Sequence, residues 1–251
     1  MSSPEEEFYV GYLDQAPPAL ARSVRARIAL VLILALGAGA LVAASQTHWE
    51  PGRFELGVER DFGGVYVHEP SSQLRVERPG GGWSRWLLVR PGKFGGNPEW
   101  SSLDGRTVEL RATLVHSGER TLLEVVPGSL AADSSEPVPS APVEALGTVS
   151  LRGEIVDSKC WLGVMNPGNL RTHRACATLC IRGGIPPILI ARDGEGRSRT
   201  MLLVGPEGEA LNRQVLPLVA LPVEVHGELE RHDDLLVLRA DPAAMRVLER
   251  E

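Results

Sequence analysis

The apolar positions of the chain form two patterns, and the first is a continuous stretch near the N-terminus. Residues 28–45 read IALVLILALGAGALVAAS and contain no charged residue. A helix of about this length spans the hydrocarbon core of a bilayer, and Trp49 suits the interface that follows. Three arginines precede the stretch: Arg22, Arg25 and Arg27. Because basic residues stay on the cytoplasmic side, we predict a cytoplasmic tail at residues 1–27, a transmembrane helix at residues 28–47 and an exported remainder.

The apolar stretch and the tail before it each have a second interpretation. A cleaved signal peptide usually has an apolar core of about 7 to 15 residues and a small-residue cleavage site. This stretch is longer and has no clear site of that kind, so an uncleaved anchor is favoured. The tail, with Phe8, Tyr9 and Tyr12, is either a disordered segment or a docking peptide for a membrane partner.

The second pattern, beyond residue 48, is the short-period alternation of β-strands, and it occurs twice. Three pairs of segments resemble each other in the same order: Trp86–Gly92 and Met201–Glu207, Asp104–Leu114 and Ala220–Leu229, Leu122–Val125 and Leu235–Leu238. Each copy has about five strands, with a candidate helix between the third and the fourth, at residues 97–103 and 209–219. Five strands with a helix at that point are typical of an OB-type barrel.

The segment between the two copies is polar and rich in proline. Residues 131–142 read AADSSEPVPSAP, a composition typical of a linker between domains. We therefore predict a mainly β protein with two tandem OB-like five-stranded barrels after one N-terminal transmembrane helix. The predicted boundaries are 48–130 for the first OB-like domain, 131–145 for the linker and 146–251 for the second OB-like domain.

Composition and charge narrow the classes of function. The net charge of −6 argues against nucleic acid as a partner, because a protein that binds nucleic acid presents a basic surface. Among 26 basic residues only Lys93 and Lys159 are lysines, which we interpret as a compositional bias.

Residues 92–96 have the glycine content of a phosphate-binding loop without its frame, so an irregular loop is expected. A polar group near the C-terminus is expected to form a solvated turn: His226, His232, Asp233 and Asp234.

The candidate chemistry lies in an insertion that only the second copy has, between its first and second strands. It contains all three cysteines and one histidine, spaced C-x12-H-x2-C-x3-C: Cys160, His173, Cys176 and Cys180. A helix that starts near Asn169 or Thr172 and stops at Gly183-Gly184 would place the last three on one face. Cys160 follows a predicted strand, so three thiols and an imidazole can meet. Such a set suits a metal ion, zinc or copper, while a haem or iron–sulfur role stays open.

Two other interpretations use fewer of these four residues. In an exported domain, Cys160 could form a structural disulfide with Cys176 or Cys180, which would leave His173 as a surface residue. A thiol oxidoreductase would need a cysteine with a low pKa beside a base, and His173 lies within reach of Cys176 on a helix. Against that interpretation, C-x3-C is not the C-x-x-C of disulfide oxidoreductases. The sequence leaves these alternatives open.

Three short motifs of the second copy form a further pattern. They are DSKC at the end of a predicted strand (157–160), HRACATLC (173–180) and GIPP (184–187). Over about residues 146–248 this resembles a group of exported bacterial OB-like proteins with a D-x-x-C, H-x-x-C-A-x-x-C and G-I-P pattern. The resemblance implies the fold and an exported location and leaves the function open. The chain is more loosely similar to the haem-chaperone OB domains of cytochrome c maturation, but it lacks their C-terminal haem-attachment histidine motif.

Together these observations predict a membrane-anchored accessory or assembly protein of the bacterial inner membrane, with its C-terminal domains in the periplasm. Its Cys3His cluster would bind a metal or redox cofactor and serve a membrane respiratory or oxidoreductase complex. The alternative is a structural interaction subunit with a disulfide-stapled insertion and no cofactor, and the minor alternative is a thiol oxidoreductase. A non-enzymatic role is favoured. The predicted partners are the lipid bilayer and a membrane protein complex.

Overall fold

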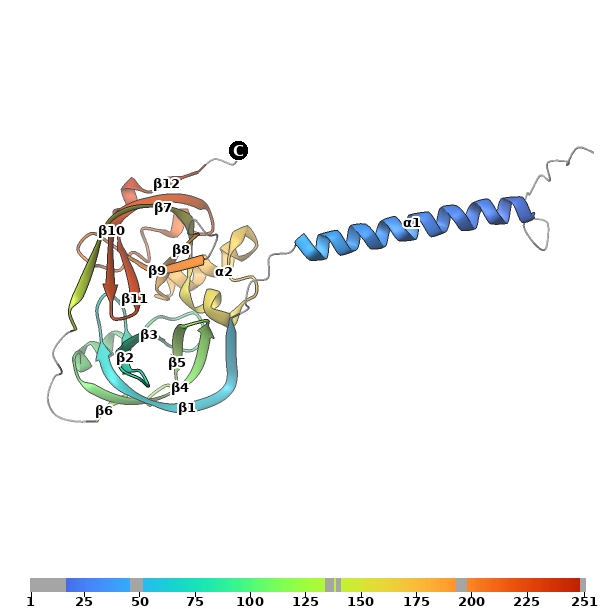
Figure 1. The fold of residues 1–251 in the computed structure, drawn as a ribbon. Coiled ribbons are helices and arrows are strands. Elements are labelled where there is room, and N and C mark those ends of the chain that lie inside the picture. The colour runs from blue at the N-terminus through green and yellow to red at the C-terminus, as the bar shows by residue number, and fades with distance from the viewer. Residues whose placement is uncertain (1–16, 46–51, 134–137, 139–140, 193–197, 249–251) are drawn as a thin grey trace, which may run out of the picture. The chain divides into compact units, whose positions relative to one another are not determined.

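One long helix comes first in the chain, and a β-rich body follows it (Figure 1). The computed structural model describes residues 17–45, 52–133, 138, 141–192 and 198–248. The helix and the body are two separate compact units. The aromatic residues predicted to act in the tail and at the membrane interface lie outside the described residues: Phe8, Tyr9, Tyr12 and Trp49.

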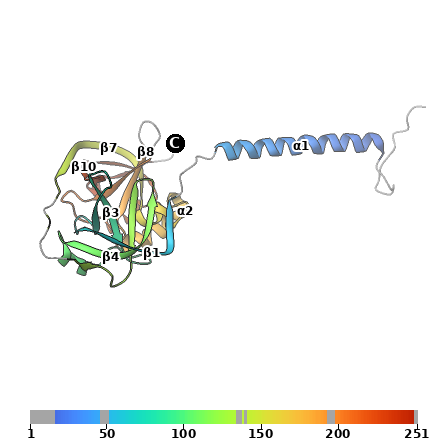
Figure 2. The same ribbon diagram turned by 60° about the horizontal axis from the view of Figure 1, so that its bottom comes forward.

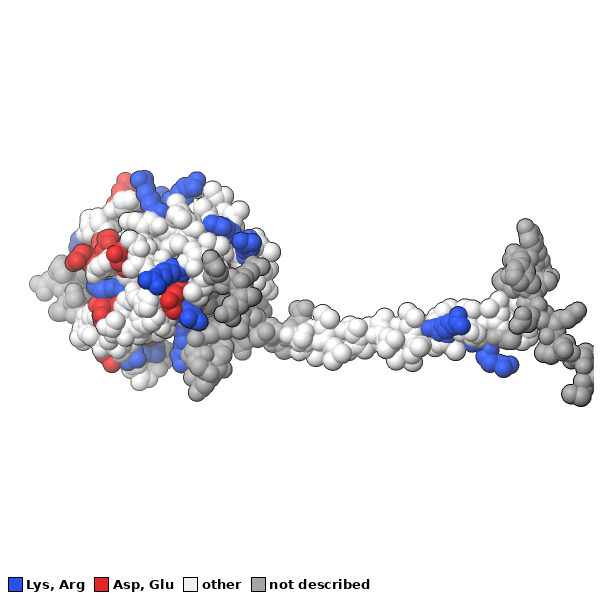
Figure 3. Space-filling view, turned by 90° about the horizontal axis from the view of Figure 1, so that it is seen from above, with Lys and Arg blue, Asp and Glu red and all other residues white. Residues whose placement is uncertain are grey.

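Helix α1 (Pro18–Ser45) contains the predicted membrane-spanning stretch. Its residues Leu20–Ser45 are long and apolar enough to cross a membrane. The helix begins before the predicted start at residue 28, because proline is well tolerated in a first turn and the Ala, Leu and Arg residues after it are good helix formers. Figure 3 shows basic side chains near one end of this helix and an uncharged surface along the rest. The helix is thus compatible with a single membrane anchor.

The first half of the body is a closed five-stranded barrel. Its strands are β1 (Arg53–Val67), β2 (Gln73–Glu77), β3 (Trp83–Val89), β4 (Thr107–Ser117) and β5 (Arg120–Val125). β1 pairs with both β2 and β4, β2 pairs with β3, and β5 joins β3 in parallel and β4 in antiparallel fashion. The sheet therefore closes on itself. The helix predicted at residues 97–103 is present as the 3-10 helix η1 (Pro98–Leu103).

The second half of the body repeats this barrel (Figure 2). Its strands are β7 (Val143–Asp157), β8 (Pro187–Arg192), β9 (Ser198–Val204), β10 (Pro222–His232) and β11 (Leu235–Arg239). They pair in the same order as the strands of the first barrel. Two short elements follow them: η4 (Pro242–Ala244) and β12 (Arg246–Val247). The predicted fold class, two tandem five-stranded barrels after one apolar helix, is confirmed.

The helix predicted at residues 209–219 is much shorter in the structure. Only Leu216–Leu218 are helical, in the 3-10 helix η3. Pro217 explains the difference, because proline has no backbone N–H and its ring collides with the preceding turn of an α-helix. A longer helix through this residue is therefore disfavoured.

The register of the strands confirms the duplication and corrects one part of its alignment. β3 pairs with β5 through Leu87 and Leu122, and β9 pairs with β11 through Leu202 and Val237. Leu87 and Leu202 are therefore equivalent, as the sequence predicts. Leu122 corresponds to Val237, however, and not to Leu235. The sequence alignment could be wrong by two residues because an alternating strand shifted by two residues presents the same pattern of faces.

In each barrel a glycine of the long first strand lies close to the backbone of the second strand. A Cβ atom at Gly64 of β1 would lie 2.6 Å from the carbonyl oxygen of Arg75, and one at Gly153 of β7 would lie 2.2 Å from the carbonyl oxygen of Ile190. Both distances are shorter than any side chain allows. Glycine therefore lets the first strand approach the second closely enough to close the barrel.

The predicted linker is partly β-structure. Ala131–Ala132 form the short strand β6 beside β4, and β7 begins at Val143, so strands enter residues 131–145 from both ends. The backbone N–H of Val138 donates to the carbonyl oxygen of Gly105 (2.7 Å), which holds Val138 against the first barrel. A polar, Pro-rich composition does not prevent such edge contacts, since they use backbone groups alone.

The two barrels pack against each other through equivalent strands. In β3, Leu88 joins the core of the first barrel, whereas Leu87 and Val89 join a cluster that contains residues of both barrels. β9 is divided between core and shared cluster in the same way. The shared cluster, here named the inter-barrel core, contains Leu87, Val89, Val115, Leu122, Val156, Cys160, Leu162, Cys180, Ile185, Ile188, Ile190, Leu202, Val204, Leu235 and Val237. Strands buried on both faces explain the continuous apolar runs of β3 and β9.

A buried ion cluster joins the β10–β11 turn of the second barrel to the first barrel. The side chain of Asp233 is 8% exposed, and its carboxylate accepts hydrogen bonds from Arg75 (3.0 Å) and Arg85 (2.8 Å). The neighbouring Asp234 accepts from the backbone N–H of Arg85 (2.8 Å), and its carbonyl oxygen accepts from the Arg120 guanidinium (2.6 Å). The expectation of a solvated turn is therefore wrong for Asp233, because its arginine partners belong to the other barrel.

Replacing Asp233 with asparagine should destabilise the body. Asparagine tolerates the left-handed backbone of this residue (φ 55°), so the turn itself should persist. Two buried guanidinium groups would lose their counter-ion, which is expected to lower the free energy of unfolding by about 3 kcal/mol. Chemical denaturation at neutral pH measures the loss, and Asp61→Asn, at an exposed position of β1, is the matched control.

The same variant tests the pH dependence of this ion cluster. Burial raises the pKa of Asp233, but the hydrogen bonds from Arg75 and Arg85 together outweigh it and hold that pKa below its usual value. The stability that Asp233 contributes is therefore complete above the unfolded-state pKa and is lost as the pH falls through the lower folded-state pKa. Wild type and variant should converge in acid. An equal difference in stability at every pH would contradict this prediction.

Candidate metal centre

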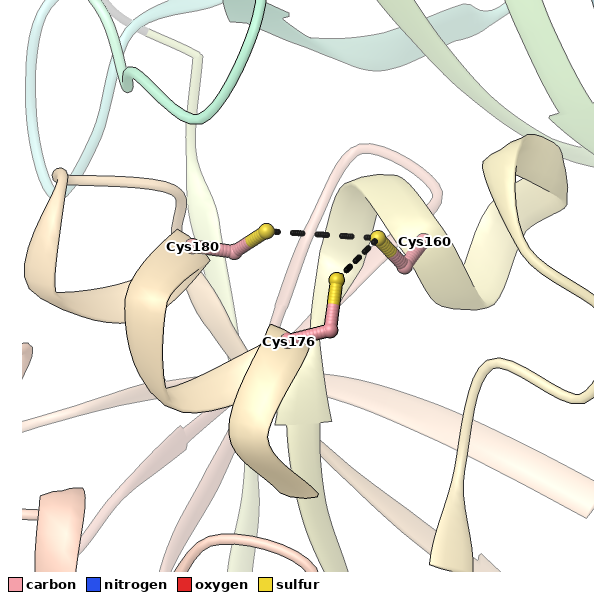
Figure 4. Close-up of side chains that lie close together, drawn as sticks. All are labelled: Cys160, Cys176 and Cys180. Atoms are coloured by element: carbon pink, nitrogen blue, oxygen red, sulfur yellow. Dashed lines mark hydrogen bonds between the residues drawn. The ribbon is translucent and has the colours of Figure 1, made fainter. Parts of the chain in front are cut away.

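The insertion of the second copy consists of a short π-helical turn and a helix. The turn, η2 (Cys160–Val164), follows β7, and the helix, α2 (Leu170–Arg182), ends at Gly183, where the sequence predicts its end. Ala177 and Ile181 of the helix pack into the core of the second barrel. This packing fixes the rotation of α2, and its two cysteines point towards the cysteine at the start of η2 (Figure 4).

The three cysteine sulfurs form one cluster. Cys160 Sγ is 4.0 Å from Cys176 Sγ and 3.9 Å from Cys180 Sγ, and all three sulfurs lie within 4.8 Å of one another (Figure 4). All three cysteines are free. Cys160 and Cys180 are only 3% and 2% exposed, whereas Cys176 is half-buried. The sulfur cluster therefore meets solvent on the side of Cys176.

His173 is bound to a carboxylate next to this sulfur cluster. Its Nε2 lies 3.1 Å from Oδ2 of Asp157, and both residues are buried. The other oxygen of Asp157 accepts a hydrogen bond from the backbone N–H of Cys160 (2.8 Å). His173, Asp157 and Cys160 form a second group whose candidate ligand atoms lie within 4.8 Å of one another. The structure thus groups His173 with Cys160 and Asp157, and Cys160 belongs both to this group and to the three sulfurs.

A lysine of the first barrel completes the surroundings of the sulfurs. Lys93 Nζ donates hydrogen bonds to Cys176 Sγ (2.8 Å) and to Cys180 Sγ (3.4 Å). Lys93 lies in the glycine-rich loop after β3, which the sequence predicts to be irregular. The site is therefore built by both barrels, although all three cysteines belong to the second.

A second lysine holds the loop of Lys93 in place. Lys159 is buried, and its Nζ donates to the carbonyl oxygen of Gly92 (2.7 Å). The same ammonium group forms an ion pair with Glu124 of β5. Lys159 precedes the first cysteine in the sequence, so one residue joins the cysteine turn to the first barrel and to the loop.

Glycines let this loop and the end of α2 touch backbone to backbone. The N–H of Gly95 donates to the carbonyl oxygen of Gly183 (3.0 Å). A Cβ atom at Gly183 would lie 1.9 Å from the carbonyl oxygen of Lys93, and one at Gly95 would lie 2.0 Å from that of Gly184. The glycines predicted from the sequence to end the helix therefore also allow the close approach that places Lys93 beside the sulfurs.

The lysine content of the chain is a signal for this site that the compositional interpretation missed. Among 26 basic residues the two lysines are Lys93 and Lys159, and both lie at the sulfur cluster or at its loop. An ammonium group is a compact charge with three rotatable donors, whereas a guanidinium is a wider planar fork. Both lysines of the chain thus lie at this site, where each ammonium group donates to more than one acceptor.

The contacts within the site lower the pKa of one cysteine and raise the pKa values of another cysteine and of Lys93. The hydrogen bond from the Cys160 thiol, with a smaller contribution from Lys93, lowers the pKa of Cys180 to about 7 against the effects of burial and of the charge of Asp157. The same hydrogen bond, together with burial and the charge of Asp157, raises the pKa of Cys160. The hydrogen bond to Cys176 raises the pKa of Lys93. The site therefore places a readily ionised thiol beside an ammonium group.

Comparisons with known proteins gave no match. No protein-family model matches the chain, and neither a curated protein nor a solved structure matches it. The resemblance to exported bacterial OB-like proteins thus stays a prediction from residues alone.

Proposed function

We propose that the protein is a membrane-anchored metal-binding protein whose ligands are Cys160, Cys176 and Cys180. The observation that carries this proposal is the convergence of three free thiols from two separate segments. A metal with three thiolate bonds of about 2.3 Å places the sulfurs about 4.0 Å apart when it lies in their plane. The separations of 4.0 and 3.9 Å from Cys160 match this value, and the third separation is within 4.8 Å. Thiolates select copper(I) or zinc over hard cations.

The disulfide interpretation fits the same geometry less well. Sulfurs in a disulfide are about 2.05 Å apart, and a bonded pair excludes the third sulfur. Cys160 lies at nearly equal distances from Cys176 and Cys180, as expected for three equivalent ligands. A disulfide with either partner would also remove an acceptor from Lys93. Three sulfur ligands keep both hydrogen bonds from Lys93.

The thiol oxidoreductase interpretation also has weak support. Its candidate base, His173, has its Nε2 at Asp157, which in turn binds the backbone of Cys160. We propose instead that His173 and Asp157 form an outer layer of the metal centre and fix the position of Cys160. Carboxylate and imidazole groups commonly orient metal ligands in this way.

The sequence of α1 and its surroundings supports a proposal for the location of the protein. We propose that the arginines at the start of this helix keep the N-terminus in the cytoplasm of a bacterial cell, so that both barrels lie in the periplasm at the inner membrane. The anchor would hold the metal centre close to membrane proteins. An accessory or assembly role for a membrane respiratory or oxidoreductase complex fits this arrangement.

The metal content of the full chain tests the proposed function. The protein, purified in detergent without chelator and without added reductant, should contain about one metal ion per chain by elemental analysis. Cys176→Ser should lose that ion, because a hydroxyl is a poor ligand for a soft metal. Ala175→Ser adds a hydroxyl at an exposed position of the same helix and should keep the ion. Metal-free wild type with one titratable thiol would instead support the disulfide-stapled interaction subunit.

Replacing His173 with alanine separates an outer role from direct ligation. If His173 supports Cys160 through Asp157, the variant should still bind one metal ion, with an affinity lower by about 10- to 100-fold. Its free energy of unfolding should fall by about 1 to 3 kcal/mol, because Asp157 would lose a buried partner. Complete loss of the ion from a folded variant would show that His173 is the fourth ligand, as the four-residue set predicted from the sequence requires.

A further inference from the structure

We propose that Lys93 is the outer cation of the metal centre and that it makes the site favour a monovalent metal, such as copper(I), over divalent zinc. This inference rests on the proposed function, because it assumes a metal ion held by the three sulfurs. It goes further in naming the class of metal and the residue of the first barrel that selects it.

The position of Lys93 does not depend on the sulfurs alone. Its loop is held at one end by Lys159, which donates to the carbonyl oxygen of Gly92 (2.7 Å). At the other end the N–H of Gly95 donates to the carbonyl oxygen of Gly183 (3.0 Å). The backbone around Lys93 is thus fixed on both sides before its side chain is considered. A mobile surface lysine would lack these contacts.

The ammonium group of Lys93 can assist a metal without binding it. A protonated amine has no lone pair, so Lys93 is a donor of hydrogen bonds and not a ligand. Its contacts of 2.8 Å to Cys176 Sγ and 3.4 Å to Cys180 Sγ place a positive charge beside two of the three ligand atoms. Each sulfur keeps lone pairs for a metal ion. The other lysine of the site, Lys159, is already paired with Glu124.

Charge counting gives the direction of the selectivity. Three thiolates with a monovalent ion carry a charge of about −2, and with a divalent ion about −1, by the ordinary charges of these groups. A cation at a fixed short distance stabilises the more negative complex more strongly. The ratio of the two affinities depends only on the two loaded forms, because the metal-free protein is common to both. Lys93 should therefore raise the affinity for copper(I) relative to that for zinc.

The test is the ratio of copper(I) to zinc affinity, measured on the full chain in detergent by competition with chelators of known affinity. Lys93→Gln removes the charge and keeps a polar side chain, and Lys93→Arg keeps the charge. Arg182→Gln removes an exposed positive charge from the C-terminal end of α2, which the loop of Lys93 contacts, and is the matched control. Because Lys93 is exposed, the variants should fold, which circular dichroism can verify.

We expect the copper(I)-to-zinc ratio to fall about tenfold in Lys93→Gln, and to stay within about twofold of wild type in Lys93→Arg and Arg182→Gln. An unchanged ratio in Lys93→Gln, with one copper(I) still bound per chain, would overturn the inference and leave the proposed function intact. An equal loss of both affinities would also overturn it, because Lys93 would then act only on the shape of the site. If wild type bound neither ion, the proposed function itself would fail.

Discussion

The inter-barrel core is the interaction on which the rest of the body depends. Strands β3 and β9 are equivalent in the two copies, and each buries one face in its own barrel and the other face against the opposite barrel. An internal duplication thereby produces an interface like that of a symmetric dimer, in which the same patch of each copy meets its equivalent. Because apolar contact is not directional, the buried charges of Asp233, Arg75 and Arg85 at its edge can define the orientation of the barrels.

The candidate metal centre follows from this packing. Cys160 and Cys180 belong to the inter-barrel core, and Cys176 lies at its border. The insertion could not have placed these sulfurs beside a lysine of the other barrel unless the barrels were docked. Lys159 and the contact between Gly95 and Gly183 then link the cysteine segment to the loop of the first barrel. The proposed ligands and the proposed outer cation come from different copies of one repeat, so metal binding would stabilise the docked arrangement.

Local patterns explain what could be predicted from the sequence. The alternation of apolar residues is a property of single strands, and the repetition of these strands can be read along the chain. Together they predicted both barrels. The helical spacing of Cys176 and Cys180 is equally local, and the structure places both on α2 facing Cys160. Helical spacing also predicted His173 on that face. The contact between its imidazole and Asp157, at the end of β7, became visible only in the structure.

The contacts between barrels could not be predicted in this way. Lys93 and Asp233 find their partners across the inter-barrel core, at residues distant in the sequence, and no spacing along the chain records such pairs. The composition contained one indirect indication of the site, the scarcity of lysine. This indication can be interpreted only after the structure shows both lysines at the same site. The solvated turn expected at Asp233 fails for the same reason, since turn residues are usually exposed unless another unit covers them.

The central claim is that three thiolates from one barrel, with a cation from the other, form a metal centre. X-ray absorption spectroscopy at the metal edge of the copper(I)-loaded full chain tests this most directly. The account predicts three sulfur neighbours at about 2.3 Å and no nitrogen neighbour. A nearest shell with two sulfurs, or one that includes an imidazole nitrogen, would contradict it.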